Sequence, residues 1–224
     1  MRSESTIRPA APEDARVAGT LIHSAMGRLA GPLLGARSTN DAAAILARLF
    51  LRRHNRFSCE FAVMAESDGE PVGIALGYSA ETMPRLEIPT AWHLLRILGA
   101  ARFTHMLRAA WPLRRVREAK AGEYFLNTVA VLRAYQARGV GTALLDHAEA
   151  QAAERGFRAC SLTVEIDNAR ACDLYQRRGY RILETTRVRL GSLGPGVLVL
   201  QRMVKPLPGK RPARSHPLPG DRDA

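Results

Sequence analysis

The stretch "NTVAVLRAYQARGVGTALLDHAE", residues 127–149, decides the fold, because it joins an apolar run to a helical run through a turn with two glycines. The run "EYFLNTVAV" over residues 123–131 is largely apolar on both alternating faces, which predicts a strand covered on both sides. A helix is expected over residues 141–155, ending at Gly156. A strand, a glycine turn and a helix in this order are typical of a site that holds an anion at the helix N-terminus.

The turn matches one of three phosphate-binding patterns. No Gly-Lys-Ser/Thr triplet is present, which excludes a P-loop, and Leu144 is too large for the third position of a dinucleotide fingerprint. The pattern Q/R-x-x-G-x-G/A fits Gln136, Gly139 and Gly141. Glycine lets the backbone approach an anion without a Cβ, and the N–H groups of residues 138–142 point toward it. A pyrophosphate is therefore the expected guest.

The flanking sequence predicts a mixed α/β domain. The strand at 123–131, the helix at 141–155 and a strand at 158–166 make a parallel βαβ crossover. A short helix and two strands follow, over residues 168–178, 180–190 and 196–205. Before the glycine turn, the patterns predict a strand, two helices and an antiparallel hairpin around Asp68-Gly69, over residues 5–10, 11–29, 40–54 and 58–79. Thr39 or Asn40 is the expected cap of the second helix.

Residues 81–120 interrupt this order with a helical insert that breaks near Gly99. One helical face carries the large apolar side chains Trp92, Phe103, Leu107 and Trp111, although Arg96 shares it. This face predicts a helix packed over the core, a substrate lid or an interfacial membrane helix. Packing or a lid is favoured, because a clean polar face is missing.

The charge of the chain is uneven. The formal net charge is +12, but residues 81–120 carry eight Arg or Lys against three Glu, and residues 205–224 carry five against two Asp. No element interleaves clustered basic residues with aromatic ones, so nucleic-acid binding ranks last among the predicted functions. Residues 206–224 are rich in proline and are expected to be a disordered tail.

Other classes of protein fit less well. The three cysteines show no C-x-x-C spacing, which argues against a disulfide framework or a structural zinc site, and no metal site is predicted. No window holds about 18 uncharged apolar residues, and no signal peptide is recognised, so we expect no stable membrane insertion and a cytoplasmic location.

A second motif lies at residues 168–180. The run "NARACDLYQRRGY" fits the pattern N-x-x-A-x-x-L-Y-x-x-x-G-[FY]. With the turn at 136–141 and the opening "IRPAAPEDA", the sequence resembles the GNAT superfamily of acyl-CoA-dependent N-acyltransferases from about residue 7 to 205. The resemblance implies an α/β domain over residues 1–205, with a mixed, mostly antiparallel sheet flanked by helices. It also implies that the central strand pair splays at a bulge.

The resemblance implies acetyl-CoA as co-substrate, or a related acyl-CoA, and a small-molecule or peptide amine as acceptor. The backbone of Val129 and Val131 would pair with the pantetheine arm, and Ala130 between them is also a predicted cofactor-binding residue. Asn168 would orient that arm or cap its own helix, and Tyr175 would protonate the departing thiolate. The pyrophosphate would be held by Gln136, Ala137, Arg138, Gly139, Val140, Gly141 and Thr142.

The general base is predicted less directly. Glu123 is the first candidate, with a solvated charge at the strand start as its alternative, and Glu165 is a weaker one. Phe125 stands where many members of the superfamily carry an acid. The predicted function is acetyl transfer to a primary amine by direct attack in a ternary complex. The alternative is a catalytically silent regulatory protein that binds acyl-CoA. A homodimer is a possible oligomeric state.

Overall fold

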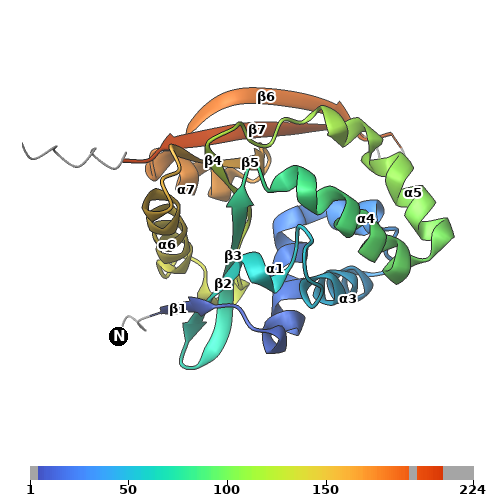
Figure 1. Ribbon diagram of the computed structural model, residues 1–224, viewed down its shortest axis with the longest axis horizontal. Helices are drawn as coiled ribbons and strands as arrows, with labels where there is room; N and C mark the ends of the chain where they lie inside the picture. The colour runs from blue at the N-terminus through green and yellow to red at the C-terminus, as the bar shows by residue number, and fades with distance from the viewer. Residues whose placement is uncertain (1–4, 192–195, 209–224) are drawn as a thin grey trace, which may run out of the picture.

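The computed structural model describes residues 5–191 and 196–208, and these build a seven-stranded sheet in the order β1-β2-β3-β4-β5-β7-β6 (Figure 1). Only β4 and β5 pair in parallel, and every other neighbouring pair is antiparallel. The predicted mixed, mostly antiparallel sheet is therefore confirmed. The strands are β1 Thr6–Pro9, β2 Ala62–Ser67, β3 Glu70–Ser79, β4 Glu123–Val131, β5 Ala159–Glu165, β6 Arg181–Arg189 and β7 Val197–Pro206.

Helices cover both faces of the sheet, with α6 and α7 on one side and α1, α3 and α4 on the other (Figure 1). This arrangement explains why β4 is apolar on both faces. Phe125 packs in the core cluster with α1 and α3, whereas Tyr124 and Leu126 pack with α6 and α7. The helices are α1 Ala15–Met26, α2 Ala30–Leu34, α3 Thr39–Phe50, α4 Met83–Leu98, α5 Ala100–Ala110, α6 Val140–Glu154 and α7 Ala169–Arg177.

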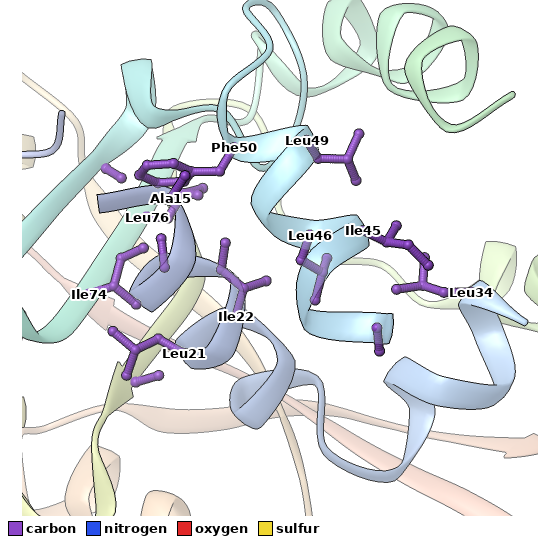
Figure 2. Packing of buried hydrophobic residues seen from close by; sticks show 14 of the residues in the cluster. Ala15, Leu21, Ile22, Leu34, Ile45, Leu46, Leu49, Phe50, Ile74 and Leu76 are labelled. Carbon is purple, nitrogen blue, oxygen red and sulfur yellow. The ribbon is translucent and has the colours of Figure 1, made fainter. Parts of the chain in front are cut away.

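The larger core cluster lies between α1, α3 and the middle strands (Figure 2). Ile22 of α1 and Leu46 and Phe50 of α3 are fully buried there, together with Ile74 of β3. The two helices approach closely because Gly19 of α1 faces the backbone of α3. This packing fixes one wall of the region beside β4.

The parallel pair opens partway along its length. β4 and β5 pair only from Glu123 opposite Ala159 to Leu126 opposite Leu162, although both strands continue further. On the other side of β4, the register with β3 shifts so that Asn127 is an extra residue. A bulge of this kind bends its strand and increases the local twist. The predicted splay of the central strands at a bulge is confirmed.

The structure corrects the predicted cap of α3. Ser38, and neither Thr39 nor Asn40, is the N-cap residue, because its Oγ accepts a hydrogen bond of 3.1 Å from the backbone N of Asp41. Thr39 lies inside the helix.

The insert folds as two helices, α4 and α5, separated at Gly99 as predicted, but its buried side differs from the predicted one. Trp92 and Trp111 are 53% and 61% exposed. Of the predicted face, Phe103 packs against the core, and the buried core contacts of the insert come from Leu86, Leu94, Leu98 and Met106. The expected apolar face failed to identify the packing side because the tryptophans lie beside arginine guanidinium groups at the surface, with Arg96 over Trp92 and Arg114 over Trp111.

The folded part extends slightly past the predicted boundary at residue 205. Strand β7 ends at Pro206, and the buried Leu207 donates its backbone N–H to the Arg158 carbonyl over 2.9 Å. The rest of the predicted tail, residues 209–224, lies outside the described residues.

Gly19→Ala is expected to destabilise the protein by about 1–3 kcal/mol, because overpacking a dense contact costs this much. The added Cβ would lie 2.9 Å from the backbone N of Ala47 and closer still to the carbonyl oxygen of Ala43. Urea unfolding measures the change. Gly31→Ala is the matched control, since a Cβ there meets no atom of residues 5–191 and 196–208 within 4 Å. Equal stability of the two variants would contradict close packing of α1 on α3.

Candidate functional site

The glycine turn lies between the end of β4 and the start of α6. Ala137 and Gly139 have φ angles of +60° and +91°, and α6 begins at Val140. The N–H groups of residues 138–142 have no acceptor among the residues that the structure describes. A helix N-terminus leaves such donors free and adds the positive end of the helix dipole. The turn therefore presents a row of donors suited to a phosphate group.

Gln136 anchors this turn to its neighbours. Its Nε2 donates to the Val131 carbonyl over 3.0 Å, and its Oε1 accepts from Arg170 Nη1 of α7 over 2.6 Å. Both ends of the amide are thus engaged within the protein. Arg138 lies with its guanidinium 5.3 Å from the centre of the Tyr135 ring. Gln136 holds the shape of the turn, and its neighbours supply the free donors.

The far half of β4 offers backbone groups to the gap. Leu132 donates its N–H to Val72 over 2.8 Å, so its peptide groups face β3. Peptide directions alternate along an antiparallel pair, which turns Ala130 toward β3 and turns Val129 and Val131 toward the gap. The two residues predicted to pair with a pantetheine arm thus present backbone groups to the open side, whereas those of Ala130 face β3.

Asn168 immediately precedes α7, and Tyr175 lies on that helix. Helix α7 is next to the glycine turn, since a Cβ at Gly141 would contact Leu174 at 3.5 Å. The Asn168 side chain accepts a hydrogen bond of 3.2 Å from the Ala171 backbone N, so it caps α7. Helix capping is one of the two roles predicted for this residue. The structure thus brings the turn and the second motif together.

Tyr175 is buried, and its ring lies 5.8 Å from that of Tyr180. Burial raises the pKa of the Tyr175 hydroxyl to about 12, so the side chain stays protonated at neutral pH. The hydroxyl makes no hydrogen bond within residues 5–191 and 196–208, and it is free to donate one to a ligand.

Glu123 lies at the closed end of the β4–β5 pair, three residues before the last paired position. It is buried, its Oε1 accepts from Arg202 Nη2 over 2.6 Å, and its Oε2 accepts from the Lys120 backbone N. A carboxylate held in this way joins β4 to β7. The role of Glu123 as the general base stays a prediction, and its pairing with Arg202 argues against it.

Glu165 ends β5 on the open side of the gap, but it too has a cationic partner. Arg28 Nε donates to Glu165 Oε1 over 2.7 Å, and Arg28 Nη2 also lies 3.6 Å from Asp167. This pair connects the loop after α1 to the end of β5. Both carboxylates considered for the general base therefore form an ion pair with an arginine.

A polar cluster at the bulge was not predicted from the sequence. Arg56, from the loop after α3, contacts Tyr78, Glu87, Glu118 and Asn127. These residues span more than 70 positions of the chain, and Arg56 and Glu118 lie in irregular segments without a motif. Only Asn127 had a signal in the sequence, as a polar residue within an apolar strand.

Within residues 5–191 and 196–208, no group of three or more His, Cys, Asp or Glu side chains is placed to hold a metal ion. In the same part of the chain, no helix combines the length and the apolar character that crossing a membrane requires.

Comparisons with known proteins agree with this geometry. A family model described as "Acetyltransferase (GNAT) family" matches residues 35–180. A solved structure described only as an acetyltransferase is 25% identical, with a TM-score of 0.66, and the match covers 91% of this chain and all of the other.

Two other solved structures share the fold. An N-acetyltransferase from Staphylococcus aureus Mu50 is 22% identical, with a TM-score of 0.72 and coverage of 89% of this chain and 100% of the other. The ribosomal-protein-S18-alanine N-acetyltransferase from Escherichia coli is 17% identical, with a TM-score of 0.54 and coverage of 95% and 99%. None of the curated proteins matches the chain.

Glu123→Gln is expected to lower the free energy of unfolding by about 3–5 kcal/mol, because breaking a buried ion pair leaves a buried charge without its partner. Asp146→Asn is the control, since its pair with Arg178 is half exposed and such pairs contribute at most about 1 kcal/mol. Thermal unfolding compares the two variants. A stable Glu123→Gln protein with a large loss of turnover would instead support Glu123 as the base.

Proposed function

The chain belongs to the acetyltransferase (GNAT) family, and from this premise we propose that it transfers an acetyl group from acetyl-CoA to a primary amine of a small molecule or peptide. The observation that carries the proposal is the row of N–H groups at residues 138–142, which have no acceptor in the described part of the chain and follow directly after the open half of β4. One element offers donors for a pyrophosphate, and the other offers strand-like pairing for a pantetheine arm.

The residues present fit this co-substrate. Gly141 lies at the first turn of α6, where a side chain would extend beside Leu174 and Val131, so its lack of one leaves room at the turn. The N–H and carbonyl groups of Val129 and the N–H of Val131 face the gap, while the Val131 carbonyl is already bound to Gln136. Acetyl-CoA would thus lie along the open edge of β4, with its phosphates at the α6 N-terminus.

The chemistry requires a neutral amine and a stabilised leaving group. An alkylammonium, with an ordinary pKa of about 10.4, must release a proton before its nitrogen attacks the thioester carbonyl. The C–N bond forms, the C–S bond breaks, the nitrogen loses a second proton, and the thiolate gains one. The backbone N–H of Val131 is proposed to donate to the carbonyl oxygen as negative charge develops on it.

Tyr175 is proposed to donate from its hydroxyl to the leaving thiolate. Its hydroxyl is protonated, unpartnered within the described residues, and carried by the helix that packs against the glycine turn. Because burial raises its pKa to about 12, the hydroxyl is best suited to donate a hydrogen bond that strengthens as charge develops on sulfur.

A catalytically silent acyl-CoA-binding regulator is the second candidate. The observation that favours it is that Glu123 and Glu165, the carboxylates on the central strands considered for the base, are both ion-paired with arginine. A cytoplasmic location and a homodimer also stay predictions.

An amine panel separates the two candidates. Purified protein is incubated with acetyl-CoA and primary amines, including polyamines, aminoglycosides and peptides with free N-termini, while free thiol is followed by a disulfide chromogen. Thiol release that depends on one class of amine, with the acetylated product seen by mass spectrometry, supports the enzyme. Tight acetyl-CoA binding by calorimetry without amine-dependent release supports the regulator.

Gly141→Glu is expected to raise the Kd for acetyl-CoA more than tenfold, because it places a carboxylate where the donor row would meet phosphate. Calorimetry measures the change. Gly31→Glu is the control, since it adds the same charge in α2, where a Cβ meets none of the described residues within 4 Å. Unchanged affinity in a folded Gly141→Glu protein would place acetyl-CoA elsewhere.

Tyr175→Phe is expected to reduce kcat about 10- to 1,000-fold and to leave the Kd for acetyl-CoA unchanged, because only the hydroxyl is removed. With a pKa of about 12, Tyr175 causes no decline of kcat between pH 6 and 10. Tyr180→Phe is the matched control, since its ring lies 5.8 Å away in the same core cluster. An unchanged kcat, with chemistry rate-limiting, would remove Tyr175 from the mechanism.

A further inference from the structure

Arg56 is the centre of the polar cluster at the bulge. Its Nε donates to the Tyr78 hydroxyl over 3.0 Å, and its Nη2 donates to Glu118 over 2.6 Å. Its Nη1 donates to Glu87 over 3.2 Å. The guanidinium thus uses its three nitrogens on three different segments: β3, α4 and the chain that leads into β4. A lysine could not contact all three segments at once, because its donors lie on a single nitrogen and not on the planar fork of a guanidinium.

The same residue contacts the bulge from both its side chain and its backbone. Arg56 Nη2 lies 3.5 Å from Asn127 Oδ1, and Asn127 Nδ2 donates back to the Arg56 carbonyl over 3.4 Å. Asn127 is the extra residue of β4 and the first one past its last pair with β5. The conformation of the bulge is therefore tied to the position of Arg56.

Arg56 also joins the two ends of the helical insert. Its backbone N donates to Thr90 Oγ1 of α4 over 3.0 Å, and Glu87 lies one turn earlier on the same helix. Glu118 follows the 3-10 turn Trp111–Arg115 at the other end of the insert. Segments near both ends of the insert thus contact the Arg56 side chain.

The cluster is buried on the Tyr78 side and open to water on the Glu87 side. Tyr78 is 2% exposed and the Arg56 side chain 18%, whereas the side chains of Glu118 and Glu87 are 29% and 57% exposed. Burial raises the pKa of Tyr78, so its phenol stays neutral and can accept from the guanidinium. The Arg56–Glu118 pair is therefore screened less than a surface pair, whereas the Arg56–Glu87 pair is exposed to solvent.

The cluster faces away from the proposed acetyl-CoA side. Val129 and Val131 pack with Val140 of α6, whereas Phe125 and Ala130 pack with α1 and α3, and Asn127 meets the loop after α3. Two substrates that react at the gap must approach it from different directions. This leaves the Arg56 side for the amine.

We infer that Arg56 is a positioning residue for the amine acceptor, because it fixes the helical insert to the bulge at the point where the central strands part. The inference rests on the proposed acetyl transfer. Arg56 touches neither reacting group in this role. It keeps α4 and the segment before β4 at a set distance from Asn127, and these segments then form the wall against which the amine is held.

The kinetic test compares Arg56→Met and Arg56→Lys with Arg53→Met, an arginine of the same loop whose side chain is 76% exposed. The acceptor is the amine of the panel that the unmodified protein acetylates fastest. Arg56→Met is expected to lower kcat/KM for that amine more than tenfold, with the Kd for acetyl-CoA within twofold. Arg56→Lys recovers part of the loss, because charge returns without the fork, and Arg53→Met retains full activity.

Hydrogen exchange gives a readout that needs no acceptor. In Arg56→Lys, amides of residues 83–98 and 118–128 are expected to exchange faster, while those of residues 140–154 in α6 are unchanged. Faster exchange throughout the protein, or an equal loss of acetyl-CoA affinity, would show a merely structural role and overturn the inference. Unchanged exchange in the insert would overturn it as well.

The two proposals fail in distinguishable ways. If the unmodified protein acetylates no amine, the proposed function fails whatever the variants do. If it acetylates an amine and Arg56→Met leaves kcat/KM unchanged, the proposed function stands and the role of Arg56 is refuted.

Discussion

One extra residue in β4 governs the architecture of the site. Asn127 shifts the register with β3, and pairing between β4 and β5 stops at the residue before it. A regular β4 would use its backbone groups on both neighbours, and the centre of the sheet would be closed. The bulge instead keeps β3 paired and releases β5. Strand groups are thereby freed in the middle of a well-packed protein, where unpaired backbone is otherwise costly.

Contacts on both sides of the opening and at its closed end hold the surrounding elements in place. On the α6 side, Gln136 ties the glycine turn to the end of β4 and to α7, so the donor row has a fixed place relative to the gap. On the other side, Arg56 ties the bulge to β3 and the insert. At the closed end, Glu123 and Arg202 connect β4 to β7 across β5. Each contact joins segments far apart in the sequence, which lets a locally open structure stay rigid.

The sequence predicted the parts whose signals are local. Alternation and apolar faces located β4 with its observed bounds, and the glycines at 139 and 141 located the start of α6 within a residue. The cap at Ser38 was missed because three neighbouring residues can all accept a backbone hydrogen bond. The burial of Trp92 and Trp111 was misjudged because an aromatic ring beside an arginine is stable at the surface. The partners of Glu123, Glu165 and Arg56 depend on tertiary contacts and have no local signal.

The order of the strands has a consequence for synthesis of the protein. β7 lies between β5 and β6 in the sheet, although it follows both in the chain. As the chain leaves the ribosome, β1, β2 and β3 can pair with one another early, but β6 has no partner until β7 has been made. The nascent chain must therefore carry an unpaired, nine-residue strand with exposed Ile182 and Leu183 while the remainder is translated. The charged residues of this strand protect it during translation, because they discourage pairing with other chains. They are Arg181, Glu184, Arg187 and Arg189.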